Sequence, residues 1–270
     1  MNLHLLPLLG APLLALLLSG CCGTCGADES KAPDPAKPAE SPSVTVIRAT
    51  EPVKLDGKLD ESFWKDAPAV ELVRYDNTAS FPPKSRERAL RDPFNGGRCR
   101  FAWDDKNLYV GVDLIDHDVN QTMTGDQKYH FKYGDTFEFF IANTANSQYW
   151  ELYATPCGNK SMLYFLAPLM PDAKENLHEL PGYTVAAYVN GKLNDGSAPD
   201  IGWSAELRIP LASLEQTMGV KFAPGAPFTC LVARYNFSRE LRWVQNSSFP
   251  KMPSLNFHLV EYYAPMDIRR

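Results

Sequence analysis

Groups that can stack on a ring and hydrogen-bond to its substituents stand close together in the last third of the chain. Arg234, Asn236 and Arg239 occur in the run ARYNFSRE, and Trp243 follows within a few residues. An aromatic face can cover the C–H surface of a ring, while guanidinium and amide groups make paired hydrogen bonds to neighbouring hydroxyls. This stretch therefore indicates a shallow binding site for a polyhydroxylated ligand. Each arginine could instead be a solvated charge at a strand edge.

Acidic side chains offer two further kinds of chemistry. Glu138 and Glu151 lie in strand-like segments with apolar neighbours, which favours carboxylates paired with Arg234 or Arg239 over catalytic ones. Aspartates could supply hard oxygen ligands to a calcium ion, although their spacing is not that of an EF-hand loop and turn formers or helix caps are the simpler interpretation. Those aspartates are Asp56, Asp60, Asp113, Asp116, Asp118 and Asp135.

The element that must organise these groups is the stretch from 98 to 120, RCRFAWDDKNLYVGVDLIDHDVN. Apolar and polar residues alternate on both sides of the turn formers DDKN at 104–107, which predicts a β-hairpin with a four-residue connection. Similar alternation recurs along the rest of the chain, for example at 137–141, 203–209 and 228–237.

This repeated alternation predicts an all-β fold, an antiparallel β-sandwich (immunoglobulin- or jelly-roll-like) of about ten strands. One short helix is expected at 211–218, a single helical turn at 61–64, and a long surface loop at 77–97. Five residues in the strongest patterns are expected in the core: Trp64, which would close one end of the sandwich, Phe101, Leu108, Phe137 and Phe139.

The N-terminal region predicts export and anchoring. Residues 5–18 are apolar but too few to span a bilayer, which needs about 20 residues. They end in LSGC, typical of a lipoprotein signal peptide over 1–20 with Cys21 as the lipidated residue; an ordinary cleaved signal is the alternative. A proline-rich tether follows at 21–43, then one domain at 44–270. We therefore expect a membrane-anchored lipoprotein, periplasmic or on the cell surface.

Composition and motifs exclude some functions. The net charge of −5 and the lack of a basic run argue against nucleic-acid binding. No GxSxG elbow, HExxH helix or phosphate loop is present, which favours a non-catalytic protein. Cys99, Cys157 and Cys230 lie in the domain, and the sequence leaves open whether two of them form a disulfide.

Seven stretches, in order, resemble the family nine carbohydrate-binding modules. They are KLDGKLDESFW (54–64), FAWDDKNLYVGVDLIDHDV (101–119), GDTFEFFI (134–141), YWELYATPCGN (149–159), GWSAELRIPLASL (202–214), ARYNFSRE (233–240), and Trp243 followed by Phe257-His258. The resemblance implies a β-sandwich that binds poly- or oligosaccharides without cleaving them, often with structural calcium, in the context of polysaccharide breakdown. It also implies that Trp243 stacks on sugar, with Tyr133 or Phe131 as the partner aromatic.

Two alternatives stay open. Relatives of this sandwich can carry a b-type haem, which would make the chain an electron-transfer domain, or the domain could be structural and bind no ligand. The possible axial ligands are His117, His130, His178, His258, Met123, Met162, Met170 and Met252.

Overall fold

The computed structural model describes residues 42–76, 81–167, 176–241 and 243–270. The predicted signal peptide, Cys21, almost all of the tether and Met170 lie outside these ranges. Within them, no helix is both long and apolar enough to cross a membrane.

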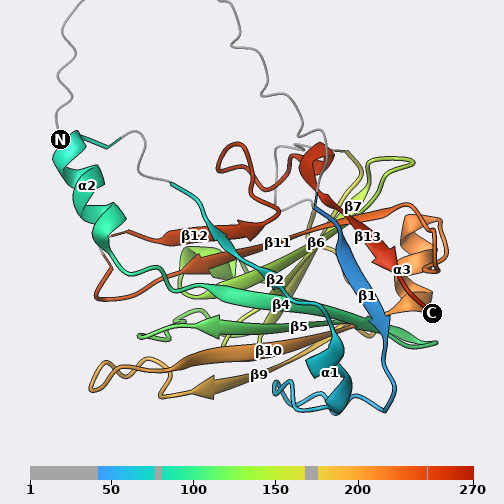
Figure 1. Ribbon diagram of the computed structural model, residues 1–270, viewed down its shortest axis with the longest axis horizontal. Coiled ribbons are helices and arrows are strands. Elements are labelled where there is room, and N and C mark those ends of the chain that lie inside the picture. The colour runs from blue at the N-terminus through green and yellow to red at the C-terminus, as the bar shows by residue number, and fades with distance from the viewer. Residues whose placement is uncertain (1–41, 77–80, 168–175, 242) are drawn as a thin grey trace, which may run out of the picture. The chain divides into compact units, whose positions relative to one another are not determined.

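Strands dominate the described part of the chain (Figure 1). The thirteen strands are β1 (Val44–Arg48), β2 (Val70–Glu71), β3 (Val73–Arg74), β4 (Gly97–Trp103), β5 (Asn107–Ile115), β6 (Thr136–Asn143), β7 (Tyr149–Ala154), β8 (Lys160–Phe165), β9 (Thr184–Asn190), β10 (Gly202–Pro210), β11 (Phe228–Asn236), β12 (Gln245–Phe249) and β13 (Ala264–Ile268). The α-helices are α1 (Ser62–Asp66), α2 (Pro83–Arg91) and α3 (Leu211–Met218), and there are 3-10 turns η1 (His130–Lys132) and η3 (Val260–Tyr262).

All these strands belong to one mixed sheet that folds back on itself. The main path runs β8-β7-β6-β11-β13-β1-β4-β5-β10-β9, and β1 pairs in parallel with both β13 and β4. The expectation of an all-β fold is confirmed, but a purely antiparallel sandwich of about ten strands with one helix was wrong. The parallel pairing joins the two ends of the domain, and alternation along a strand carries no information about its neighbours' direction.

The predicted hairpin and core are confirmed. β4 and β5 pair antiparallel, although Asn107 already belongs to β5, so the connection is 104–106 and is one residue shorter than predicted. The ring of Phe101 lies 5.9 Å from that of Phe139, between centroids, across the interior. All five predicted core residues are buried. Trp64 differs in place: it packs with Phe63 and Tyr109 in a separate cluster under α1 and does not lie in the main core.

The helices show where prolines mislead. α3 has the predicted bounds and ends at Gly219, whose φ of 70° permits the left-handed cap. The expectation of an irregular loop at 77–97 was wrong, because α2 forms within it. Pro83 occupies the first turn of α2, where a helix tolerates proline, so this proline marks a helix start.

Candidate functional site

The layer formed by β6, β7, β8 and β11 is buried on both faces. One face of β6, containing Phe137, Phe139 and Ile141, packs into the main core. The other face belongs to a second apolar cluster, which the C-terminal segment covers with Met252, Phe257, Tyr262 and Tyr263. Where this cover stops, the outer face of the layer is left hollow.

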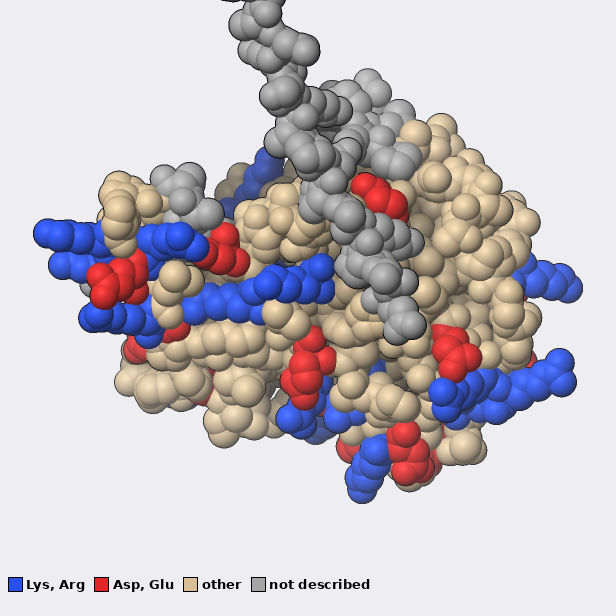
Figure 2. Space-filling view, turned by 45° about the horizontal axis from the view of Figure 1, so that its top comes forward, with Lys and Arg blue, Asp and Glu red and all other residues tan. Residues whose placement is uncertain are grey.

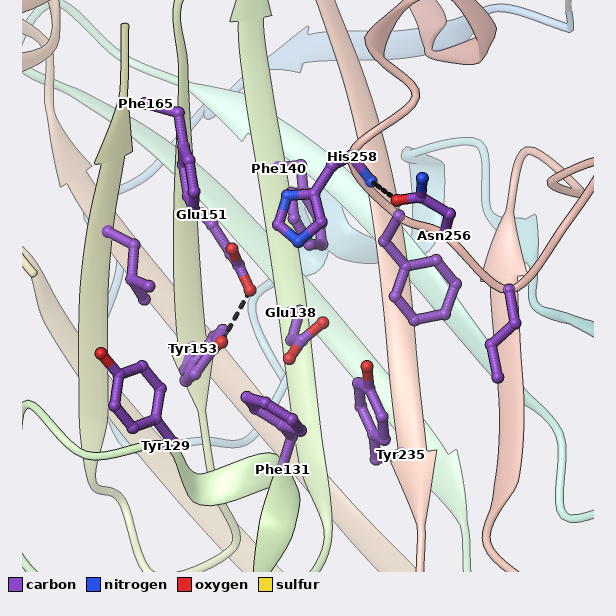
Figure 3. A pocket seen from close by; sticks show the side chains of 13 residues that line it. Tyr129, Phe131, Glu138, Phe140, Glu151, Tyr153, Phe165, Tyr235, Asn256 and His258 are labelled. Carbon is purple, nitrogen blue, oxygen red and sulfur yellow. Dashed lines mark hydrogen bonds between the residues drawn. The ribbon is translucent and has the colours of Figure 1, made fainter. Parts of the chain in front are cut away.

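The hollow is a pocket of about 420 Å³. Aromatic rings from β6, β7, β8, β11, the segment around η1 and the C-terminal segment line it (Figure 3). Its lining consists of Tyr129, Phe131, Glu138, Phe140, Glu151, Tyr153, Leu163, Phe165, Tyr235, Leu255, Asn256, Phe257 and His258. The volume falls within the range of small-molecule sites, about 300–1,000 Å³.

Two carboxyl groups project from the sheet into this pocket. Glu138 on β6 lies opposite Tyr153 on β7, and Phe140 lies opposite Glu151, so the two glutamates are diagonal neighbours on one face. The Tyr153 hydroxyl donates a hydrogen bond to Glu151 Oε1 at 2.6 Å. Glu138 is 1% exposed and Glu151 4%.

Burial sets the protonation of this pair. It raises the pKa of Glu151 to about 7, against the opposing effect of the Tyr153 hydrogen bond. The pKa of Glu138 is raised well above its usual value by burial and by the negative charge of Glu151. Neither carboxyl pairs with a lysine, arginine or histidine among the described residues. The pair therefore retains a proton near neutral pH.

Contacts between aromatic rings, and a hydrogen bond to an imidazole, fix the side chains of the pocket walls. Phe131 lies with its ring centroid 5.2 Å from that of Tyr235 and 6.2 Å from that of Tyr153. Tyr149 bonds His258 Nδ1 at 2.9 Å, and burial lowers the pKa of this histidine, which keeps it neutral. Ring faces, carboxyl groups and an imidazole can together stack on a ligand and both donate and accept hydrogen bonds.

Only part of the predicted site lines this pocket. Phe131, Glu138 and Glu151 come together there, while Tyr133, 48% exposed, does not line it. The hypothesis that Glu138 and Glu151 pair with arginines was wrong, because the arginines point elsewhere.

Arg234 faces the interior of the domain. It is 0% exposed, pairs with Asp116 at 2.8 Å and bonds the carbonyl oxygens of Asn95 and Ile115, each at 2.8 Å. Asn236 is also buried and accepts a bond from Arg234 at 3.0 Å. Their placement as ligand contacts was wrong. Successive residues of β11 point to opposite faces, so Tyr235 reaches the pocket instead.

Arg239 and Trp243 lie at two other places on the surface. The guanidinium of Arg239 pairs with Asp118 beside a separate hollow of about 190 Å³. Trp243 is 44% exposed, and its ring centroid lies 4.4 Å from that of Phe81, which precedes α2. The structure does not bring these residues into one site with Phe131, so the expected single site is corrected.

The aspartates organise loops in the way that turn formers do. Asp135, for example, accepts bonds from the backbone N–H groups of Asn120 and Phe237, both at 2.7 Å. Among the described residues, no group of three or more His, Cys, Asp or Glu side chains could hold a metal ion. The haem candidates are scattered; both ring nitrogens of His130 are within hydrogen-bonding distance of oxygens, of Gly125 at 2.9 Å and of Ser161 at 3.1 Å. Cys99, Cys157 and Cys230 are free thiols.

Comparisons with known proteins bear on the fold. No family model and no curated protein matches the sequence. A family 9 carbohydrate-binding module from Caldicellulosiruptor kristjanssonii in complex with cellotriose aligns over 84% of this chain and 93% of its own, with 13% identity and a TM-score of 0.56. The same organism's module in complex with glucose gives 83% and 95%, 11% identity and a TM-score of 0.54. This chain has the family 9 module fold.

A third structure agrees. A protein from Bacteroides uniformis ATCC 8492, provisionally designated as carbohydrate-binding, aligns over 85% of this chain and 100% of its own, with 12% identity and a TM-score of 0.62. The resemblance read from the seven stretches is thereby confirmed at the level of the fold.

Within this family 9 fold, sequence reasoning missed several pocket residues, among them Tyr129, Tyr153, Tyr235 and His258. A signal for them was present. In QYWELYAT, Tyr149, Glu151 and Tyr153 alternate with Trp150 and Leu152, so both faces of the strand are bulky. A strand with bulky residues on both faces must be covered on its second face, so Glu151 and Tyr153 could have been expected beneath a cover and not in solvent.

Proposed function

We propose that this chain binds carbohydrate without cleaving it, and that the ligand occupies the pocket on the outer face of β6, β7, β8 and β11. The observation that carries the proposal is the combination of aromatic walls with two carboxyl groups on the pocket floor (Figure 3). Sugar rings need both an apolar face to cover their C–H groups and polar partners for their hydroxyls. The complexes of two structural neighbours with cellotriose and glucose support this ligand class.

The expected affinity is modest. Aromatic contacts contribute about 0.5–1.5 kcal/mol each beyond area burial, and hydroxyl partners exchange bonds with water for a small net gain. A dissociation constant in the micromolar range or weaker follows, as about −8 kcal/mol corresponds to 1 µM.

The placement of the carboxyl groups favours binding over hydrolysis. A glycosidase needs two carboxyls that flank the scissile bond, one to protonate the leaving group and one on the other side. Glu138 and Glu151 instead stand on adjacent strands of one floor, so a ligand resting on the pocket has both on the same side.

The test compares two aromatic residues two positions apart. Phe131→Ala removes a pocket wall, whereas Tyr133→Ala removes a ring outside the pocket and serves as the matched control. Calorimetric titration with cellotriose should show at least tenfold weaker binding for Phe131→Ala and an unchanged constant for Tyr133→Ala. The opposite ranking, or release of reducing sugar by the wild-type protein, would contradict the proposal.

We further propose that the chain is a lipoprotein anchored through Cys21, with its signal peptide over 1–20, and that it works at the cell envelope in polysaccharide breakdown. The LSGC run and the proline-rich stretch after it motivate this proposal. Replacing Cys21 by Ala should move the protein from the membrane fraction to the soluble fraction. Unchanged retention in membranes would rule out the lipid anchor.

A further inference from the structure

The thirteen residues that line the pocket include two acidic groups but no lysine or arginine, and burial lowers the pKa of the one histidine among them, His258. Burying an ionised carboxylate costs several kcal/mol unless a cation or several hydrogen bonds compensate it. The buried Asp116 has such a cation in Arg234. For Glu138 and Glu151, the described chain supplies the Tyr153 hydroxyl but no positive charge.

The pocket walls are of the kind that attract cations. Ring faces carry negative potential and bind ammonium groups within about 6 Å of their centroids. The chain shows this behaviour at the rim, where Lys132 Nζ lies 5.3 Å from the centroid of Tyr129 and 5.7 Å from that of Phe131. Lys132 itself does not line the pocket.

We propose that the natural ligand of this pocket is a cationic sugar, an amino sugar whose amine is free and protonated, with the ammonium group bound between Glu138 and Glu151. The inference rests on the proposed carbohydrate binding and names its substrate class. The aromatic walls cover the sugar ring, and the ligand's ammonium group supplies the positive charge that no described residue brings to the two carboxyl groups. An N-acetylated sugar has the same ring but no charge, so it lacks the contact that sets the preference.

Binding of an ammonium group should displace a proton. The titratable groups that face the site are Glu138 on β6, Glu151 and Tyr153 on β7, Tyr235 on β11, and Tyr129 and His258 on the loops; the lining residues of β8, Leu163 and Phe165, are neutral. The carboxyl pair holds a proton near pH 7, and a bound cation favours its ionised form. Affinity for an amino sugar should therefore rise from pH 5 to pH 7, with proton release to the buffer.

The experiment titrates the full chain with three trisaccharides: β-1,4-linked glucosamine, its N-acetylated form, and cellotriose. Glucosamine trisaccharide should bind at least tenfold more tightly than the other two, and only its heat of binding should depend on the ionisation enthalpy of the buffer. Glu138→Gln and Glu151→Gln, which keep the side-chain shape but remove the charge, should each bring the ratio of glucosamine-trisaccharide affinity to cellotriose affinity down to about one. Glu261→Gln, on the exposed η3 turn, controls for attraction of a cation to the net negative protein.

The outcomes separate the two proposals. Equal or tighter binding of cellotriose, unaffected by Glu138→Gln, would overturn the cationic ligand and leave carbohydrate binding in place. Failure of all three sugars to bind would overturn both. An amino-sugar affinity that falls equally with Glu261→Gln would reduce the effect to general surface charge and overturn the proposed site.

Discussion

Two pairs of buried carboxyl groups lie on opposite faces of the same sheet layer, and they are compensated differently. Asp116 and Asp135 meet Arg234 in the interior, where backbone N–H groups complete their bonding. Glu138 and Glu151 lie on the outer face and open into a cavity. Neighbouring residues of β11 lie beside the two pairs: Arg234 points inward to Asp116, and Tyr235 points outward into the pocket.

This difference distinguishes a polar cluster that stabilises the fold from one that is suited to binding a ligand. Burial raises the pKa of both Asp116 and Asp135, and the charge of Asp116 raises that of Asp135 further, whereas the positive charge of Arg234 lowers both, so the protein itself supplies the cation of this cluster. That cluster is complete without a ligand. Among the residues that the structure describes, no cation offsets the burial of the Glu138–Glu151 pair, and strongly shifted pKa values of this kind occur often at functional sites.

Removal of the interior cation should have the largest effect. Arg234→Met keeps the apolar stem but leaves the two aspartates unpaired, and we expect a loss of about 3–5 kcal/mol in the free energy of unfolding at pH 7. Urea unfolding followed by tryptophan fluorescence measures it. The matched control is Arg239→Met, whose guanidinium is half-exposed beside Asp118 and should therefore contribute less than that of Arg234. Equal losses for the two variants would show that the interior cluster does not stabilise the fold more than a surface ion pair does.

Removal of an acid from the outer pair should increase the free energy of unfolding. The pKa of Glu151 is about 7 in the folded protein and about 4.3 when unfolded, so its neutral form is favoured by folding. The associated stability is fully present below the unfolded pKa and is lost as pH rises through 7. Glu151→Gln should therefore raise the free energy of unfolding at pH 8 by up to about 3 kcal/mol and change little at pH 4.

Melting temperatures across this pH range check the sign. Glu179, which is exposed, gives a control variant in which substitution by Gln should leave the pH dependence of the wild type. A Glu151→Gln variant that melts lower than the wild type at pH 8 would mean that the ionised group is already compensated within the protein.

The same comparison shows how far the sequence could be read. The hairpin of β4 and β5, the burial of Phe137 and Phe139 and the extent of α3 follow from local patterns, and all were predicted. Local patterns do not show which face of β11 carries the site. Arg234 and Tyr235 are adjacent in the sequence, and only the packing of β11 against β6 and β12 decides which of them meets a ligand.

Trp243 was expected in one site with the arginines, and the structure places it elsewhere for a related reason. In sequence it follows ARYNFSRE closely, but the chain places it beside Phe81, a residue 162 positions earlier, near α2. Lysines and arginines gather over α2 (Figure 2), in contrast with the pocket, whose lining has none. Nearness in sequence and nearness in space differ most where a strand ends and the chain leaves the sheet.

The smallest effect is expected from Trp243 itself, which belongs to neither carboxyl pair. Its ring is 44% exposed and contacts Phe81, so Trp243→Ala should lower the free energy of unfolding by about 1 kcal/mol at most. Trp150, 1% exposed and bonded to Thr217 at 2.9 Å, is the buried counterpart, and its truncation to Ala should cost about 3–5 kcal/mol.

Cellotriose affinity then decides what Trp243 does. If the pocket is the site, Trp243→Ala should bind within twofold of the wild type, since the indole lies outside the lining. A loss of tenfold or more in a variant that melts normally would place the sugar on the Trp243–Phe81 surface and remove the pocket from consideration. Because the substitution barely disturbs folding, the change in affinity alone distinguishes a stacking surface beside α2 from a pocket on the outer face of the sheet.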